Sequence, residues 1–173
     1  EWRYPPNCKE FWESGQSMEN RGKLVACLKA LGIEPSVESF SERKKMQKIA
    51  YLLERFKVNL GFSSSFSWYM YGPYSPPLTR ALFEINDNPP KVTIKLSKAD
   101  RERVAHLKEF LGKDMESADR IELLASLDYI MRIGKEQCVS DDDIIKAFKQ
   151  KKPFYENEEI AAAWTKLNSL AKQ

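Results

Sequence analysis

The chain has 173 residues, of which 42% are hydrophobic and 31% are charged, and this composition excludes a disordered chain and a membrane-embedded one. The 28 Lys and Arg residues exceed the 25 Asp and Glu residues by three, a balance that by itself indicates no nucleic-acid partner. No apolar run approaches the roughly 20 residues needed to span a bilayer, so we expect a soluble globular protein of the cytoplasm.

The three cysteines, Cys8, Cys27 and Cys138, lie far apart and form no CxxC pair. With His106 as the only histidine, no cysteine–histidine zinc site can be composed from neighbouring residues. We therefore expect free thiols in a reducing compartment, no disulfide, no zinc and no cofactor.

Residues 1–17 differ in character from the rest of the chain. Pro5-Pro6 blocks a helix, whereas Trp2, Phe11 and Trp12 are too apolar for a free tail. Met18 begins a regular pattern, so we expect residues 1–17 to be an aromatic arm or a leader, and residues 18–173 to form a single helical domain.

Two helices are predicted first. Leu24, Leu28 and Leu31 recur at helical spacing over residues 18–31. Ser41 is the predicted N-cap of the second helix, which runs to about Lys57. The apolar stripe of this second helix is wide, which indicates a central, mostly buried helix.

Residues 66–71 alternate, with Phe66, Trp68 and Met70 on one face, and predict a strand that Gly72-Pro73 ends. A short helix is predicted next, over residues 75–86, entered through a proline pair. Residues 91–96 alternate again and predict a second strand, which we expect to pair with the first because a lone strand leaves its backbone unsatisfied.

Four more helices are predicted, over residues 97–111, 117–133, 140–152 and 157–170. The fold class is therefore α+β but predominantly α, with about seven helices and a small two-stranded sheet. A helix, strand, helix, strand order leaves a winged-helix arrangement open.

No pattern points to an enzyme. His106 has no serine or cysteine near it in sequence, and Asp141 to Asp143 lack the spacing of a calcium loop and suit a helix N-terminus better. Phosphate-binding, dinucleotide, zinc-protease and hydrolase motifs are absent. An enzyme would need a pocket that joins His106 to distant carboxylates or to a cysteine.

Two features point to binding. Tyr69, Tyr71 and Tyr74 are candidate partner-binding residues, together with Lys48 on the neighbouring basic helix face, because tyrosine combines apolar area with a polar tip. Trp68 is expected to face the core. The alternative is a nucleic-acid-binding regulator that uses Arg43, Lys44, Lys48 and Lys151 to neutralise phosphates.

Two stretches also resemble a known family. KMQKIAYLL (residues 45–53) and WYMYGPYSP (residues 68–76) resemble the paired "KLQKLLYF … YGPV" signature of the Panacea, or SocA-like, antitoxin domains. They look closer still to the YwgA-like proteins of bacteria and archaea. Weaker similarities occur at ELLASL (residues 122–127), KPF (residues 152–154) and around Trp164.

The resemblance spans about residues 41–170 and implies a mostly helical, non-enzymatic domain. In the Panacea case such a domain neutralises or escorts a toxin by direct contact. We therefore expect a protein-interaction or regulatory module whose partner is a protein, such as a toxin or a regulatory protein. The sequence assigns neither the oligomeric state nor the partner.

Overall fold

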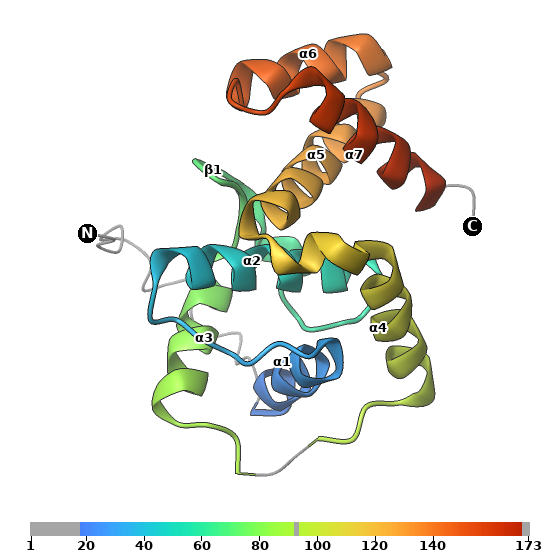
Figure 1. Cartoon of the computed structure of the whole chain (residues 1–173). Coiled ribbons are helices and arrows are strands. Elements are labelled where there is room, and N and C mark those ends of the chain that lie inside the picture. Colours follow the sequence, from blue (N-terminus) through green and yellow to red (C-terminus); the bar gives the residue numbers. More distant parts are fainter. Residues whose placement is uncertain (1–17, 92–93, 171–173) are drawn as a thin grey trace.

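Seven α-helices and one antiparallel hairpin form the part of the chain that the structure, a computed structural model, describes: residues 18–91 and 94–170 (Figure 1). The elements in chain order are α1 (Met18–Leu31), α2 (Phe40–Arg55), η1 (Ser63–Ser65), β1 (Ser67–Tyr69), β2 (Gly72–Tyr74), α3 (Pro76–Asp87), α4 (Lys98–Leu111), η2 (Gly112–Glu116), α5 (Ala118–Glu136), α6 (Asp141–Lys151) and α7 (Asn157–Leu170). The predicted fold class, with its seven helices and two-stranded sheet, is confirmed.

Helices α2 and α5 form the centre of the fold and pack extensively on each other. Both bury nearly continuous runs of side chains, Met46 to Leu53 in α2 and Ile121 to Asp128 in α5. In Figure 1, α6 and α7 lie at one end of the molecule and α1, α3 and α4 at the other, with α2 and α5 between them. The wide apolar stripe of α2 is thus explained by neighbours on several sides.

The second helix starts earlier than predicted. The hydroxyl of Ser39, not Ser41, accepts from the backbone N–H of Glu42 at 3.1 Å, and the Glu42 carboxylate accepts from the Ser39 N–H at 2.9 Å. This reciprocal pair is a capping box, which satisfies two backbone donors at once. Ser41 is exposed in the first turn of the helix.

The hairpin also differs from the prediction. Gly72-Pro73 does not end a strand but belongs to β2, in which Tyr69 pairs with Gly72 and Trp68 with Pro73. Gly72 has a φ of +93°, a conformation that glycine adopts without strain and that reverses the chain after Met70. A proline is tolerated because each strand of a two-stranded sheet is an edge strand.

Of the predicted strand over residues 91–96, the described residues 91 and 94–96 form no strand, and residues 92 and 93 lie outside the described residues. Both described strands fall between α2 and α3, so the helix, strand, helix, strand order behind the winged-helix alternative is absent from the described chain. The first strand, β1, pairs with β2, which follows it directly in the chain, because a two-residue turn returns the chain alongside β1.

Two further predictions can be compared with the described residues. None of the helices there combines the length and the apolar character needed to cross a membrane. Cys27 is buried and Cys138 exposed, and both are free thiols, whereas Cys8 and the rest of the predicted arm lie outside the described residues.

Candidate interaction site at the hairpin

The hairpin is fixed to α2 by two buried polar side chains. Gln47 makes a two-way contact with Ser75, accepting from its N–H at 3.0 Å and donating to its carbonyl at 3.1 Å. At the adjacent position of α2, Nζ of Lys48 donates to the carbonyl of Pro73 at 2.8 Å. These bonds satisfy backbone groups that a two-stranded sheet cannot satisfy itself, so the hairpin is held in one position.

A buried carboxylate on α5 connects the hairpin to α6. Oε1 of Glu122 lies 2.5 Å from Nζ of Lys152, and Oε2 lies 2.7 Å from Nζ of Lys44. Lys152 also donates to the carbonyl of Met70 at 3.2 Å, and Lys44 contacts Asp119 at 2.9 Å. We call Lys44, Lys48 and Lys152 the lysine cluster.

The lysine cluster places three amines beside two carboxylates, the buried Glu122 and the exposed Asp119. Lys48 and Lys152 are 2% and 1% exposed, and Glu122 is the only carboxylate buried among them in the described chain. The pKa of Lys48 is lowered to about 7, chiefly by burial; Glu122 opposes this shift, and Lys152 and Lys44 contribute to it. Near neutral pH the Lys48 amine therefore changes its protonation state inside the fold.

Aromatic rings gather around the end of Lys152. Its Nζ lies 5.4 Å from the ring centre of Tyr71, 5.5 Å from that of Phe154 and 6.0 Å from that of Trp68. Lys151 places its own Nζ 5.4 Å from the Trp68 ring. Cations over ring faces are attractive, so the two lysines join the hairpin to the segment between α6 and α7.

The hairpin and the segment between α6 and α7 expose large apolar side chains to solvent. Seven large hydrophobic side chains are exposed in the described chain, and four of them belong to the hairpin or contact its neighbours. Met70 and Phe154 are 66% and 63% exposed. Phe40 packs edge-on against Tyr71, with ring centres 5.0 Å apart. The group that we call the hairpin surface consists of Phe40, Tyr69, Met70, Tyr71, Lys151 and Phe154.

The predicted partner-binding residues fall into two groups. Tyr69 is 45% exposed, and Tyr71 is half-buried at the edge of the hairpin surface. Tyr74 is half-buried and its hydroxyl accepts from Thr79 at 3.0 Å, so it belongs to the framework of the hairpin. Lys48 does not lie on an exposed helix face, because its side chain is buried against the hairpin.

The predicted nucleic-acid-binding residues do not form one open basic face. Arg43 donates to the carbonyl of Val37 at 2.7 Å, Lys44 is held by carboxylates, and Lys48 is buried. Lys151 is exposed. The sequence nominated these residues for their positive charge alone, but α5 brings a carboxylate to this face of α2 and the hairpin covers Lys48.

Sequence reasoning missed Glu122, Lys152 and Met70 as members of the site. Glu122 had a visible signal, since it interrupts an apolar run between Ile121 and Leu123, and a carboxylate on a core stripe needs a buried partner. Trp68, expected in the core, is half-buried, and Met70 is exposed at the turn. Burial across a two-residue turn cannot be read from alternation alone.

A second buried polar network lies beside the hairpin. The Tyr51 hydroxyl donates to Asp128 at 2.5 Å, and the Arg55 guanidinium contacts the same carboxylate at 2.6 Å and 3.1 Å. Burial raises the pKa of Tyr51, and the Asp128 charge raises it further. The network joins α2 to α5 and leaves Tyr51 as a hydrogen-bond donor rather than a base.

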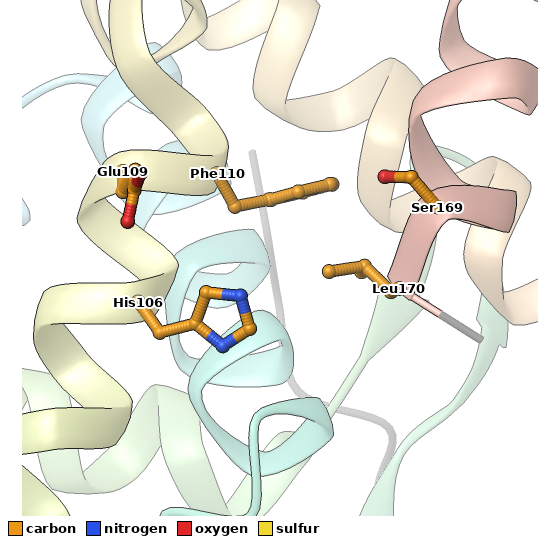
Figure 2. Close-up of a pocket in the computed structure, with 5 residues that line it drawn as sticks. All are labelled: His106, Glu109, Phe110, Ser169 and Leu170. Carbon is orange, nitrogen blue, oxygen red and sulfur yellow. The ribbon is translucent and has the colours of Figure 1, made fainter. Parts of the chain in front are cut away.

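His106 lies in a different place, at an open pocket of about 460 Å³ between α4 and α7 (Figure 2). The pocket is lined by His106, Glu109 and Phe110 from α4 and by Ser169 and Leu170 from α7. Ser169 donates to the Lys166 carbonyl of its own helix at 2.7 Å, and the His106 ring packs edge-on against Phe56. The pocket joins His106 to a carboxylate of its own helix, and its lining contains neither a cysteine nor a carboxylate distant in sequence.

Within residues 18–91 and 94–170, no three His, Cys, Asp or Glu side chains gather as a metal site would require. Comparison of the chain with protein-family models, with curated proteins and with solved structures finds no match. The hairpin surface, supported from below by the lysine cluster, is therefore defined by its geometry alone.

Proposed function

We propose that this protein is a non-enzymatic protein-interaction module that binds its partner through the hairpin surface. The observation that carries the proposal is the exposure of Tyr69 and Met70 on the hairpin and of Phe154 after α6, two segments that hydrogen bonds of Lys48 and Lys152 hold in place. Large apolar side chains on a rigid support are typical of binding hot spots. The resemblance to Panacea and YwgA-like proteins supports the same class of function.

A nucleic-acid-binding regulator remains the second candidate and has less support. Binding along a phosphate backbone requires several free cations on one face. Of the four nominated residues, Arg43, Lys44 and Lys48 are engaged with carbonyls or carboxylates, which leaves Lys151 on the open surface. Protein binding needs only the apolar patch.

Affinity purification of the tagged full-length chain from its source cell, split into nuclease-treated and untreated halves, tests the proposal. The wild type is compared with Met70→Glu/Phe154→Glu, which puts two charges on the hairpin surface. The matched control is Phe83→Glu/Val139→Glu, because Phe83 and Val139 are exposed to 36% and 38% and lie on α3 and before α6. All three proteins are first checked for equal thermal stability.

We expect a partner protein to co-purify in stoichiometric amount with the wild type, with or without nuclease. The control variant should capture the same amount. The hairpin variant should capture at least about tenfold less, as loss of a hot spot predicts. A partner captured equally by both variants would place the interface elsewhere. If nucleic acid co-purifies and nuclease treatment removes all of the bound material, the second candidate is favoured.

A further inference from the structure

We infer that the hairpin surface binds, within the same molecule, the aromatic arm of residues 1–17 that precedes α1. The arm lies outside the described residues; its composition, its length and the point at which it joins the fold carry the inference. The inference goes beyond the proposed function, because it names an occupant that an external partner would have to displace.

The arm carries large apolar side chains that need a partner. Four of its 17 residues are aromatic, namely Trp2, Tyr4, Phe11 and Trp12. Such rings bury large areas, and tryptophan and tyrosine are the residues most enriched at binding hot spots. Pro5-Pro6 blocks a helix beside the first two rings, so their apolar area is best covered by the folded domain.

The hairpin surface is the apolar area that matches these rings. Of the seven large hydrophobic side chains exposed in residues 18–91 and 94–170, four belong to it: Phe40, Tyr69, Met70 and Phe154. The other three lie on separate parts of the chain: Met18, Phe83 and Val139. Methionine adapts its shape to its neighbours, and its sulfur contacts aromatic rings favourably. The hairpin surface therefore offers an aromatic ring several contacts at once.

The arm joins the fold close to the base of the hairpin. A Cβ added at Gly61 would lie 2.5 Å from Nδ2 of Asn20, in the first turn of α1. Gly61 precedes η1, which ends at Ser65, and Oγ of Ser65 lies 2.6 Å from Oγ of Ser75, directly after β2. The start of α1 is thus connected through residues 61–65 to the base of the hairpin.

The arm is long enough to cover the remaining distance. Met70 follows Gly61 by nine positions, a path of at most about 32 Å for an extended chain. Met18 follows Tyr4 by 14 positions, which span up to about 50 Å when extended. The rings at the far end of the arm can therefore reach the hairpin surface without any change in the fold.

The covalent connection favours the arm over an external ligand. A ligand joined to its site by a short flexible linker has an effective concentration in the millimolar range. Two or three rings of modest affinity are then enough to fill the surface. An external partner has to compete with them, so the arm controls access to the hairpin surface.

Cys8 allows the inference to be tested on the full-length chain. In a Cys138→Ser protein a nitroxide can be attached to Cys8, because Cys27 is buried and burial raises the pKa of its thiol to about 12. Isotope-labelled methionine methyl groups then report their distance from the nitroxide, since nearby signals broaden. Met70 reports on the hairpin surface, Met18 on the junction with the arm, and Met115 in η2 is the control.

Two matched variants separate the rings of the arm from its charges. The ring variant replaces its four aromatic residues: Trp2→Ser/Tyr4→Ser/Phe11→Ser/Trp12→Ser. The charge variant replaces two cations and two anions, which keeps the rings and the net charge: Arg3→Ser/Lys9→Ser/Glu10→Ser/Glu13→Ser. Equal thermal stability and equal broadening of Met18 are required of all the proteins.

We expect Met70 to broaden strongly with the natural arm and with the charge variant, while Met115 stays sharp. In the ring variant the broadening of Met70 should fall at least about fivefold, because an arm that is only tethered samples a large volume. Broadening of Met70 that is absent from the natural arm, or equal in the ring variant, would overturn the inference.

A second copy of the chain is tested by mixing. Protein that carries the nitroxide but no isotope is combined with protein that carries the isotope but no nitroxide. We expect Met70 to stay sharp in this mixture. Broadening as strong as in the doubly labelled protein would overturn the inference, because the arm would then bind a neighbouring molecule.

Partner capture separates the inference from the proposed function. In the affinity purification the ring variant should capture at least about threefold more partner than the wild type, because a competitor has been removed. Unchanged capture, despite loss of Met70 broadening, would place the partner's interface elsewhere and overturn the proposed function alone. Capture that depends on Met70 and Phe154, without any broadening of Met70, would overturn the inference alone.

Discussion

Nζ of Lys152 lies 2.5 Å from Oε1 of Glu122, although the two residues are 30 positions apart and both side chains are almost fully buried. Through this contact the end of α6 is joined to the start of α5. Because Lys152 also donates to the Met70 carbonyl, the same contact sets the position of the hairpin turn. The exposed side of the site thus depends on a buried ion pair.

Breaking this pair from one side should be costly. Glu122→Gln removes the charge that compensates Lys152 and Lys44, and an uncompensated buried ammonium group typically costs about 3–5 kcal/mol. We expect the free energy of unfolding, measured in urea, to fall by that amount. Glu122→Leu/Lys152→Met, which removes both charges, should lose clearly less stability than the sum of the losses of Glu122→Leu and Lys152→Met. Additive losses would show that the two residues are not coupled.

Lys48 should make stability rise with pH just above neutrality. Its pKa is about 7 in the folded protein and 10.5 ordinarily, so between these values the unfolded chain binds a proton that the folded chain does not. The free energy of unfolding therefore increases with pH, by up to about 1.4 kcal/mol per pH unit. Below pH 7 the amine is charged in both states and the full cost of burying the charge is present.

The measurement is urea unfolding between pH 7 and 8.5, with Lys48→Met as the control, which should lack this slope. The window ends there because burial raises the pKa of Cys27 to about 12. Above pH 8.5 the unfolded thiol loses its proton and the folded one does not, which lowers stability as pH rises. Equal slopes for the wild type and Lys48→Met would contradict the prediction.

Gly72 should not tolerate a side chain. A Cβ at this position would lie 2.0 Å from Oγ of Ser126, and φ is +93°. We expect Gly72→Ala to combine backbone strain with overpacking, each worth about 1–3 kcal/mol. Gly32→Ala is the control, because Gly32 also has a positive φ, +79°, but nothing within 4 Å of the added Cβ. Equal losses for the two variants, measured by urea unfolding, would mean that the hairpin does not pack on Ser126.

The start of α2 can be tested with two exposed serines. Ser39→Ala removes the cap and should cost about 1 kcal/mol. Ser41→Ala should change the thermal midpoint little, because Ser41 is exposed inside the helix. A larger loss of stability for Ser41→Ala than for Ser39→Ala would show that Ser41 is the N-cap, as the sequence predicted.

The sequence by itself determined the helices, because their apolar stripes, caps and closing glycines are local signals. The first helix ends at Leu31, where its periodicity predicts, and Ser140 caps α6 by accepting from the Asp143 N–H. Local signals failed where two nearby residues compete for one role, as Ser39 and Ser41 do. They also failed at the hairpin, because Gly72-Pro73 marks a turn without saying whether the chain leaves the sheet or returns to it.

Only the tertiary structure decided the composition of the site. The aromatic candidates were visible in the sequence, but which of them face outward depends on how the hairpin rests on α2 and α5. The lysines were visible too, yet charge in a sequence carries no information on burial. Glu122 brings Lys44 and Lys152 together from elements far apart in the chain, and such pairing is a property of packing.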